Sequence, residues 1–232
     1  MQSKFKNINK LSIVILCGGK GERLYPYTND IPKPLLEIKN KPILSYIIEH
    51  LARFEMQELI FATGYKSDKI KHFIDSKYSG CDYKTIDSGN VDIIKRIQDA
   101  SQYIQNDFMI LYGDTLSNVN YNKLLEFHKS NKQPATMTVW PLQSQFGVVD
   151  IAEDGKVLNF HEKPILDKWI NIGYFCFRKE MIEDLFKHSS YATWIKTLAA
   201  KEMLNAYKHK GIHITVNTIK ELADAEKNVD KI

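Results

Sequence analysis

A segment near the N-terminus brings together residue types that bind phosphate groups. In order along the chain, these residues are Leu16, Gly18, Gly19, Gly21, Arg23, Pro32, Lys33 and Pro34. Glycine lacks a Cβ atom, so the backbone N–H groups of such a turn can approach phosphate oxygens closely. An arginine adds a planar fork of permanently charged donors, and a lysine adds an ammonium group. The segment is therefore typical of a loop that binds a nucleoside triphosphate.

Two prolines restrict the backbone around Lys33. Each proline fixes its own φ and restricts the residue before it, which predicts an extended backbone from Ile31 to Pro34 with the ammonium held in one direction. Other interpretations compete with this one. A dinucleotide-binding fingerprint needs a glycine in place of Leu24, and a Walker-type loop needs Ser or Thr after its Gly-Lys pair. A purely structural glycine turn would explain the glycines but not the whole set of charged residues.

The elements that must position these residues alternate between strand and helix patterns. The expected strands are 11–16, 59–63, 82–86 and 108–111, and the expected helices are 42–54, 67–75 and 91–103. This alternation favours a mostly parallel sheet covered by helices on both faces. The last of these strands leads into Tyr112-Gly113-Asp114. Asp114 is therefore expected at the carboxyl edge of the sheet, where open α/β sheets bind their ligands.

The second half of the chain departs from simple alternation. Strand patterns at 135–141, 147–151, 157–162 and 172–177 are joined only by loops, and are followed by a helix pattern at 194–204, a strand at 213–216 and a helix at 220–228. The consecutive strands favour a small antiparallel or mixed layer over the sheet edge. We therefore expect one α/β domain, Rossmann-like and three-layered, preceded by a loosely ordered arm at residues 1–10.

Composition sets bounds on the class of protein. A chain of 232 residues with 44% hydrophobic residues can form one large α/β domain. The net charge of +4 is spread along the sequence, so no nucleic-acid partner is indicated. No apolar window approaches the roughly 20 residues that span a bilayer, so no membrane partner is expected and a cytoplasmic location is the default. Cys17, Cys81 and Cys176 lack metal-ligand spacing and are expected to be reduced core thiols.

The chain resembles the sugar-1-phosphate nucleotidylyltransferases, and most of all their glucose-1-phosphate cytidylyltransferase branch. The family signature Gly-Gly-x-Gly-x-Arg-Leu…Pro-Lys-Pro is matched between Gly18 and Pro34. Further matches are Tyr112-Gly113-Asp114, Phe146-Gly147-Val148-Val149, Phe160-His161-Glu162-Lys163-Pro164 and Trp169-Ile170-Asn171-Ile172-Gly173. The resemblance covers nearly the whole chain. It implies the nucleotide-diphospho-sugar transferase type of fold, with a nucleotide-binding half at 11–134 and a sugar-phosphate-binding half at 135–232.

The resemblance also implies an activity and site residues. The activity is transfer of a nucleotidyl group from a nucleoside triphosphate, with CTP favoured, to a sugar 1-phosphate for surface-glycan biosynthesis. Arg23 is implied at the β- and γ-phosphates, Lys33 at the α-phosphate, and Asp114 as a ligand of Mg²⁺. The implied nucleotide-binding residues are Leu16, Gly18, Gly19, Gly21, Arg23, Ser88 and Gly89. The implied sugar-phosphate-binding residues are Gly147, Glu162, Lys163 and Asn171.

The sequence departs from the family pattern in two places. Members usually carry a second metal-binding aspartate, and the aligned residue here is Asn217, whose amide is neutral. The segment 87–96 lacks the Gly-Gly-Arg that normally precedes Lys-Arg in the cytidylyltransferase branch. Two alternatives therefore stay open: a guanylyl- or other nucleotidylyltransferase acting on a mannose- or heptose-like 1-phosphate, and a non-catalytic relative that binds nucleotide or sugar phosphate. A homo-oligomer is also compatible with the sequence, but no motif specifies one.

Overall fold

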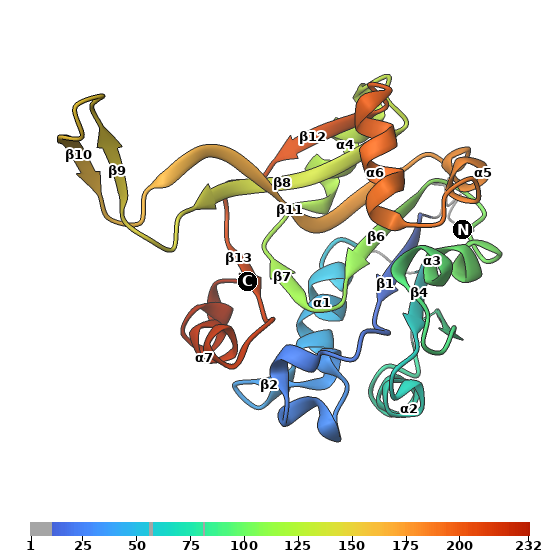
Figure 1. The fold of residues 1–232 in the computed structure, drawn as a ribbon. Coiled ribbons are helices and arrows are strands. Elements are labelled where there is room, and N and C mark those ends of the chain that lie inside the picture. Colours follow the sequence, from blue (N-terminus) through green and yellow to red (C-terminus); the bar gives the residue numbers. More distant parts are fainter. Residues whose placement is uncertain (1–10, 56–57, 81) are drawn as a thin grey trace, which may run out of the picture.

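The fold is built on one mixed, mostly parallel sheet. The computed structural model of the chain describes residues 11–55, 58–80 and 82–232. The sheet has seven strands in the order β12-β8-β11-β6-β1-β4-β5 (Figure 1). Their bounds are β1 (Ser12–Leu16), β4 (Glu58–Thr63), β5 (Tyr83–Asp87), β6 (Phe108–Tyr112), β8 (Ala135–Gln143), β11 (Ile165–Phe177) and β12 (Leu204–Lys208). Only β11 runs antiparallel to its two neighbours. The mostly parallel sheet predicted from the sequence is confirmed.

Helices cover both faces of the sheet, as predicted. They are α1 (Ile43–Ala52), α2 (Ser67–Lys77), α3 (Ile93–Ser101), α4 (Tyr121–Ser130), α5 (Met181–Leu185), α6 (Tyr191–Ala200) and α7 (Ile219–Asn228). Alternate residues of β1 enter two separate apolar clusters. Ile13 and Ile15 pack with α1, α2, α4 and α7, whereas Val14 packs with α3, α5 and α6. None of the helices in the described ranges is long and apolar enough to cross a membrane.

Several element boundaries differ from the prediction. The helix expected at 194–204 is α6, which ends at Ala200 because Glu202 takes a left-handed backbone conformation (φ 56°), and the chain then enters β12. The backbone expected to be extended up to Pro34 instead forms a 3₁₀ turn at Lys33–Leu35, with Leu35 N–H donating to the Pro32 carbonyl at 2.8 Å. Helices α4 and α5 were not predicted. Residues 1–10 and Cys81 lie outside the described residues.

The four consecutive strands of the second half do not form one layer over the sheet edge. β8 and β11 belong to the central sheet, because β11 pairs with β6 and β8 pairs with the other edge of β11. Of these four strands, β9 (Val148–Ile151) and β10 (Val157–His161) lie outside the central sheet and pair with each other as a two-stranded antiparallel sheet. Figure 1 shows this pair extending away from the body of the molecule. We call residues 144–164 the projecting hairpin.

Two short strand pairs complete the fold, and one of them shapes the carboxyl edge of the central sheet. β2 (Glu37–Ile38) pairs with β3 (Lys41–Pro42), and β7 (Thr115–Ser117) pairs with β13 (His213–Thr215). Asp114 precedes β7, and the backbone N–H of Val216, just after β13, donates to its carbonyl at 3.3 Å. The second pair therefore brings Asp114 next to Asn217.

A buried arginine joins the loops at this edge. Arg96, on α3, is 4% exposed. Its guanidinium donates to the Thr63 carbonyl at the end of β4, to the Gly89 carbonyl at 3.2 Å and to the Val91 carbonyl at 2.8 Å. One side chain thus donates to three backbone carbonyls from two separate segments of the chain.

The same guanidinium explains two glycines. A Cβ atom on Gly18 would lie 2.0 Å from Arg96 Nη1, and a Cβ atom on Gly64 would lie 2.3 Å from it. Both contacts are too close for any larger residue. Arg96 therefore packs directly against the backbone of the glycine loop and holds the loop against β4.

We predict that Arg96→Met lowers the free energy of unfolding by about 3 kcal/mol, because it removes three hydrogen bonds to backbone carbonyls and opens a gap beside Gly18. Urea denaturation followed by circular dichroism measures this change. Lys95→Met is the matched control, because the Lys95 side chain is next to Arg96 in the sequence but is 56% exposed. We expect this variant to lose no more than about 0.5 kcal/mol. Equal losses for the two variants would contradict the structural role of Arg96.

Candidate active site

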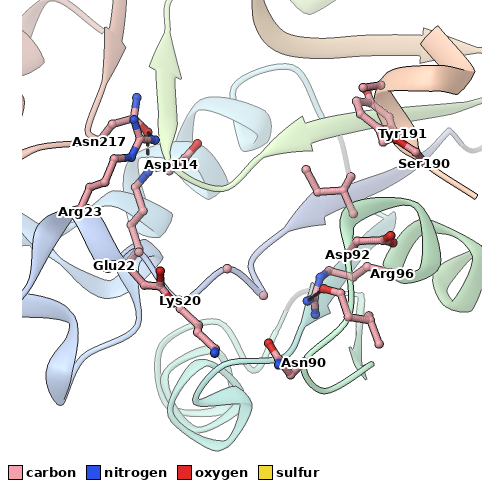
Figure 2. A pocket seen from close by; sticks show the side chains of 17 residues that line it. Lys20, Glu22, Arg23, Asn90, Asp92, Arg96, Asp114, Ser190, Tyr191 and Asn217 are labelled. Atoms are coloured by element: carbon pink, nitrogen blue, oxygen red, sulfur yellow. Dashed lines mark hydrogen bonds and ion pairs between the residues drawn. The ribbon is translucent and has the colours of Figure 1, made fainter. Parts of the chain in front are cut away.

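A pocket of about 780 Å³ opens at the carboxyl edge of the central sheet (Figure 2). One wall is the glycine loop and the turn after it, lined by Gly18, Gly19, Lys20, Gly21, Glu22, Arg23 and Lys33. The other walls are lined by Asn90, Val91, Asp92, Ile93, Arg96, Asp114, Ser190, Tyr191, Ala192 and Asn217. The pocket therefore takes residues from both halves of the chain.

Lys33 lies at the centre of the polar contacts in this pocket. It is 8% exposed, and its ammonium donates to the Asp114 carboxylate and to Oδ1 of Asn217 at 2.8 Å. Arg23 donates to the same Asn217 oxygen at 3.3 Å. Two cations and two oxygen-bearing side chains, from widely separated parts of the sequence, thus meet at one point (Figure 2).

Backbone and side-chain contacts fix the two oxygen-bearing residues. Asp114 follows β6, where the Gly113 N–H donates to the Leu16 carbonyl at 3.0 Å. The Asn217 side-chain amide donates to Oγ1 of Thr215 at 2.7 Å, which leaves its oxygen to face Lys33. The Asn217 backbone N–H donates to the Glu221 carboxylate in the first turn of α7, at 2.5 Å.

The glycine loop presents Arg23 by a turn that needs a left-handed residue. Gly21 has a φ of 67°, a backbone conformation that residues with a side chain rarely adopt. Its carbonyl accepts from the Leu24 N–H at 2.9 Å and from the Thr28 hydroxyl at 3.0 Å. Leu24 is fully buried, so the turn is anchored on one side while Arg23 remains exposed on the other.

The oxygens around Lys33 fit a divalent cation that is shared with a phosphate. A carboxylate and an amide oxygen already share one cation here, the Lys33 ammonium. Mg²⁺ prefers oxygen ligands and usually binds through one or two carboxylates plus substrate phosphates. In the ranges that the structure describes, no group of three or more His, Cys, Asp or Glu side chains could hold a metal ion. Asp114 and Asn217 are therefore suited to hold Mg²⁺ together with a bound triphosphate rather than alone.

Some of the expected nucleotide-binding residues do not line the pocket. Leu16, Ser88 and Gly89 are absent from the described residues that line it. The residues that follow them, 90–93, form the wall instead, where Asp92 caps α3 by accepting from the Lys95 N–H at 3.1 Å. A capping aspartate before a helical pattern is a signal in the sequence that could have identified this wall. Ser190, Tyr191 and Ala192 carry no such signal, because only the tertiary fold brings α6 to the pocket.

The four residues expected at the sugar phosphate are likewise absent from the described lining of the pocket. Gly147, Glu162 and Lys163 lie on the projecting hairpin. The Glu162 and Lys163 side chains are 64% and 58% exposed, and their charged ends are 3.9 Å apart. Asn171 is on β11, where its side-chain oxygen accepts from the Gly173 N–H at 2.8 Å.

Two other titratable groups near the pocket are kept neutral by burial. Burial, together with the charge of Asp114, raises the pKa of the Cys17 thiol above its ordinary range. Burial lowers the pKa of His213 to about 4. Cys17 and Cys176 are both free and buried, as predicted for reduced core thiols. Cys17 and His213 therefore supply neither a nucleophile nor a charge to the pocket.

Comparison with known proteins agrees with this architecture. The "Probable glucose-1-phosphate cytidylyltransferase" of Bacillus subtilis (strain 168) is 34% identical to this chain, over 94% of this chain and 95% of that protein. The "D-glycero-alpha-D-manno-heptose 1-phosphate guanylyltransferase" of Campylobacter jejuni subsp. jejuni serotype O:2 is 29% identical, over 75% and 79%. The crystal structure of HddC from Yersinia pseudotuberculosis is similar with a TM-score of 0.74 and 26% identity, over 94% and 99%.

The family match extends over the whole pocket. The model of the family described as "Nucleotidyl transferase" matches residues 12–220. This range includes every strand of the central sheet and all the residues that line the pocket at its carboxyl edge. The chain therefore belongs to the nucleotidyl transferase family.

Proposed function

We propose that this protein transfers the cytidylyl group of CTP to a sugar 1-phosphate and releases pyrophosphate. The observation that carries the proposal is the nearly buried Lys33 ammonium, held between Asp114 and Asn217 beside a glycine loop. The choice of CTP is supported by the 34% identical relative from Bacillus subtilis. The product, an activated sugar nucleotide, suits the biosynthesis of surface glycans.

The reaction needs positive charge more than it needs a base. A phosphate monoester has a second pKa of about 6, so its oxygen is already anionic at neutral pH. This oxygen attacks the α-phosphorus of the nucleotide and forms a new P–O bond. The bond between the α-phosphorus and the bridging oxygen breaks, and pyrophosphate leaves with the electron pair. The main obstacle is repulsion between two polyanions, which fixed cations and backbone donors reduce.

In this proposal, Lys33 and Arg23 supply this charge. With a nucleotide bound, the Lys33 ammonium donates to an α-phosphate oxygen and stabilises the negative charge that grows in the transition state. Because the group is 8% exposed, little water competes for it, so its electrostatic effect is larger than at the surface. Arg23 is exposed at the mouth of the pocket and binds the β- and γ-phosphates bidentately.

Asp114 and Asn217 would hold Mg²⁺ against the triphosphate. When bound, this ion neutralises phosphate charge and acts as a Lewis acid. Asp114 supplies the charged ligand, and the neutral Asn217 amide supplies a weaker one. The glycine loop adds backbone N–H groups, and Asn90 to Ile93 face the space between this loop and α6, where we place the nucleoside.

A guanylyltransferase acting on a heptose- or mannose-like 1-phosphate is the second candidate. It is supported by the likeness to the guanylyltransferase of Campylobacter jejuni and by the missing Gly-Gly-Arg in the segment 87–96. Pyrophosphate release distinguishes the two candidates. Five common nucleoside triphosphates are crossed with a panel of sugar 1-phosphates in the presence of Mg²⁺, with Asp114→Ala as the blank.

We predict pyrophosphate release with CTP and a hexose 1-phosphate in this assay. Release with GTP and a manno-configured 1-phosphate, but not with CTP, would establish the second candidate instead. Binding of nucleotide by calorimetry without release from any pair would show a non-catalytic relative and would contradict the proposed function.

Replacement of Lys33 by alanine should lower kcat by about a hundredfold or more, because the lost interaction is strongest in the transition state. Steady-state kinetics at saturating nucleotide measure this change. The matched control is Lys39→Ala, an exposed lysine that pairs with Asp230, for which unchanged kcat is expected. A Lys33→Ala enzyme within about threefold of the wild type would exclude the assigned role.

Asn217→Asp should lower the Mg²⁺ concentration needed for half-maximal activity by about fivefold to tenfold, because a second carboxylate binds the ion more tightly. Asp114→Asn should abolish most Mg²⁺-dependent turnover. Asn120→Asp is the control for charge, since this helix-capping residue of α4 tolerates either side chain. Identical Mg²⁺ titrations for Asn217→Asp and the wild type would rule out Asn217 as a ligand.

A further inference from the structure

The segment between Arg23 and Lys33 has little apolar packing to hold it in place. Residues 25–31 form most of this segment and include the 3₁₀ turn Tyr27–Asn29. Within residues 25–31, only Thr28 is buried, at 3% exposed. The large side chains of the segment are exposed, at 68% for Tyr25, 51% for Tyr27 and 44% for Ile31. The position of the turn therefore depends on polar contacts.

Tyr65 makes polar contacts with both the glycine loop and this turn. It lies after β4 and Gly64, just before α2, and it is half-buried. Its backbone N–H donates to the Gly18 carbonyl at 3.2 Å. Its hydroxyl donates to the Thr28 carbonyl at 2.9 Å, and the Asn29 carbonyl lies 3.3 Å from the same oxygen. One residue thus joins the start of the glycine loop to the turn that precedes Lys33.

Thr28 connects the turn to the groups expected at the triphosphate. Its hydroxyl donates to the Gly21 carbonyl at 3.0 Å. A Cβ atom on Gly21 would lie 3.0 Å from Cγ2 of Thr28 and 3.2 Å from Cβ of Lys33, so the three residues pack closely. Gly21 also precedes the 3₁₀ turn Glu22–Leu24, which carries Arg23. A shift of Thr28 would therefore move the backbone beside both cations.

A cavity beside these contacts shows that close packing does not replace them. It has a volume of about 260 Å³ and is lined by Lys20, Glu22, Tyr25, Thr28, Asn29 and Tyr65. Side chains thus leave open part of the space between the glycine loop, the turn and Tyr65. One further hydrogen bond comes from α2, where the Lys69 ammonium donates to the Asp30 carbonyl at 2.7 Å. Hydrogen bonds from Tyr65 and Lys69 therefore hold the turn where packing is incomplete.

We infer that Tyr65 is a positioning residue, whose hydroxyl holds the turn that fixes Arg23 and Lys33 against the triphosphate. The inference rests on the proposed function, in which these two cations bind the phosphates of the nucleotide. Tyr65 is absent from the described residues that line the active-site pocket, so it acts through the turn and not on the substrate. Such an effect can be large, because a displacement of about 1 Å in a positioned group can cost about a hundredfold in rate.

Tyr65→Phe tests this role, because it removes the hydroxyl and keeps the ring. We expect kcat to fall about tenfold and the KM for the nucleotide to rise at least about threefold, whereas the KM for the sugar 1-phosphate stays unchanged. Steady-state kinetics with the substrate pair found by the pyrophosphate assay measure these changes. A merely structural role would reduce the amount of folded enzyme, and so kcat, without changing the KM for the nucleotide.

Tyr46→Phe is the matched control. The Tyr46 hydroxyl also donates to a backbone carbonyl, that of Ile38 at 2.9 Å, and Tyr46 is likewise half-buried. Both rings lie under a lysine, with Lys41 over Tyr46 and Lys66 over Tyr65. Because Tyr46 lies on α1 and is not among the described residues lining the pocket, we expect wild-type kinetics. Kinetic constants of the two variants within about twofold of each other, with an active wild type, would overturn the inference and leave the proposed function intact.

A double variant tests the connection through Thr28. Thr28→Val removes the hydroxyl that bonds to Gly21 and keeps the shape of the side chain. If Tyr65 acts through the turn, Tyr65→Phe combined with Thr28→Val should lose no more kcat than the weaker of the two single variants, because both changes break the same series of contacts. Losses that multiply in the double variant would contradict this route.

Hydrogen exchange tests the positioning without the chemistry. Within the segment, the Asn29 N–H donates to the Pro26 carbonyl and the Leu24 N–H to the Gly21 carbonyl, both at 2.9 Å. We expect peptides that cover residues 22–36 to exchange at least about tenfold faster in ligand-free Tyr65→Phe than in the wild type, and at the wild-type rate in Tyr46→Phe. Unchanged exchange in Tyr65→Phe would overturn the inference. A wild type that releases no pyrophosphate from any pair would instead contradict the proposed function, and exchange would still decide whether Tyr65 holds the turn.

Discussion

The Lys33 ammonium is held almost out of water, and the carboxyl edge of the sheet is organised around that constraint. A buried charge is tolerated only when other groups replace its hydration. Asp114 and Asn217 provide this replacement, although they lie 81 and 184 residues away in the sequence. This arrangement requires three segments to meet: the end of β6, the turn after the glycine loop and the start of α7. In the proposed function, the same oxygens become available to a metal ion when a triphosphate pairs with the Lys33 ammonium.

Arg96 solves a similar problem in a different way. Its partners are backbone carbonyls of β4 and of the loop before α3, and Gly18 and Gly64 leave the space that it fills. Backbone carbonyls in fixed loops cannot be exchanged for substrate groups. Arg96 therefore has a structural role, whereas Lys33 has side-chain partners that a ligand can displace.

The sequence predicted the parts of the molecule that depend on local pattern. The β-branched run of β1, the helical spacing of α1 and the position of Asp114 after β6 follow from side-chain periodicity and from the rule that ligands bind at the carboxyl edge. The Pro-Lys-Pro motif likewise indicates Lys33 as a site residue by its residue types alone. The family resemblance put Asn217 near Asp114, but the contact between Lys33 and Asn217 could not be predicted, because no local pattern indicates that β7 pairs with β13. Equally, the strand patterns of β9 and β10 were correct, but nothing in them shows that the hairpin leaves the body of the fold.

The long separations within the pocket also have a consequence for how the chain folds. A contact between residues 184 positions apart gains nothing until a long loop of chain has closed, so we expect it to form late in folding. The glycine loop and its neighbouring helices can assemble from nearer segments, whereas the contact between Lys33 and Asn217 waits until α7 has docked. Interactions that form after the transition state govern mainly the rate of unfolding. We therefore expect the polar centre of this pocket to affect the lifetime of the native protein more than the rate of its folding.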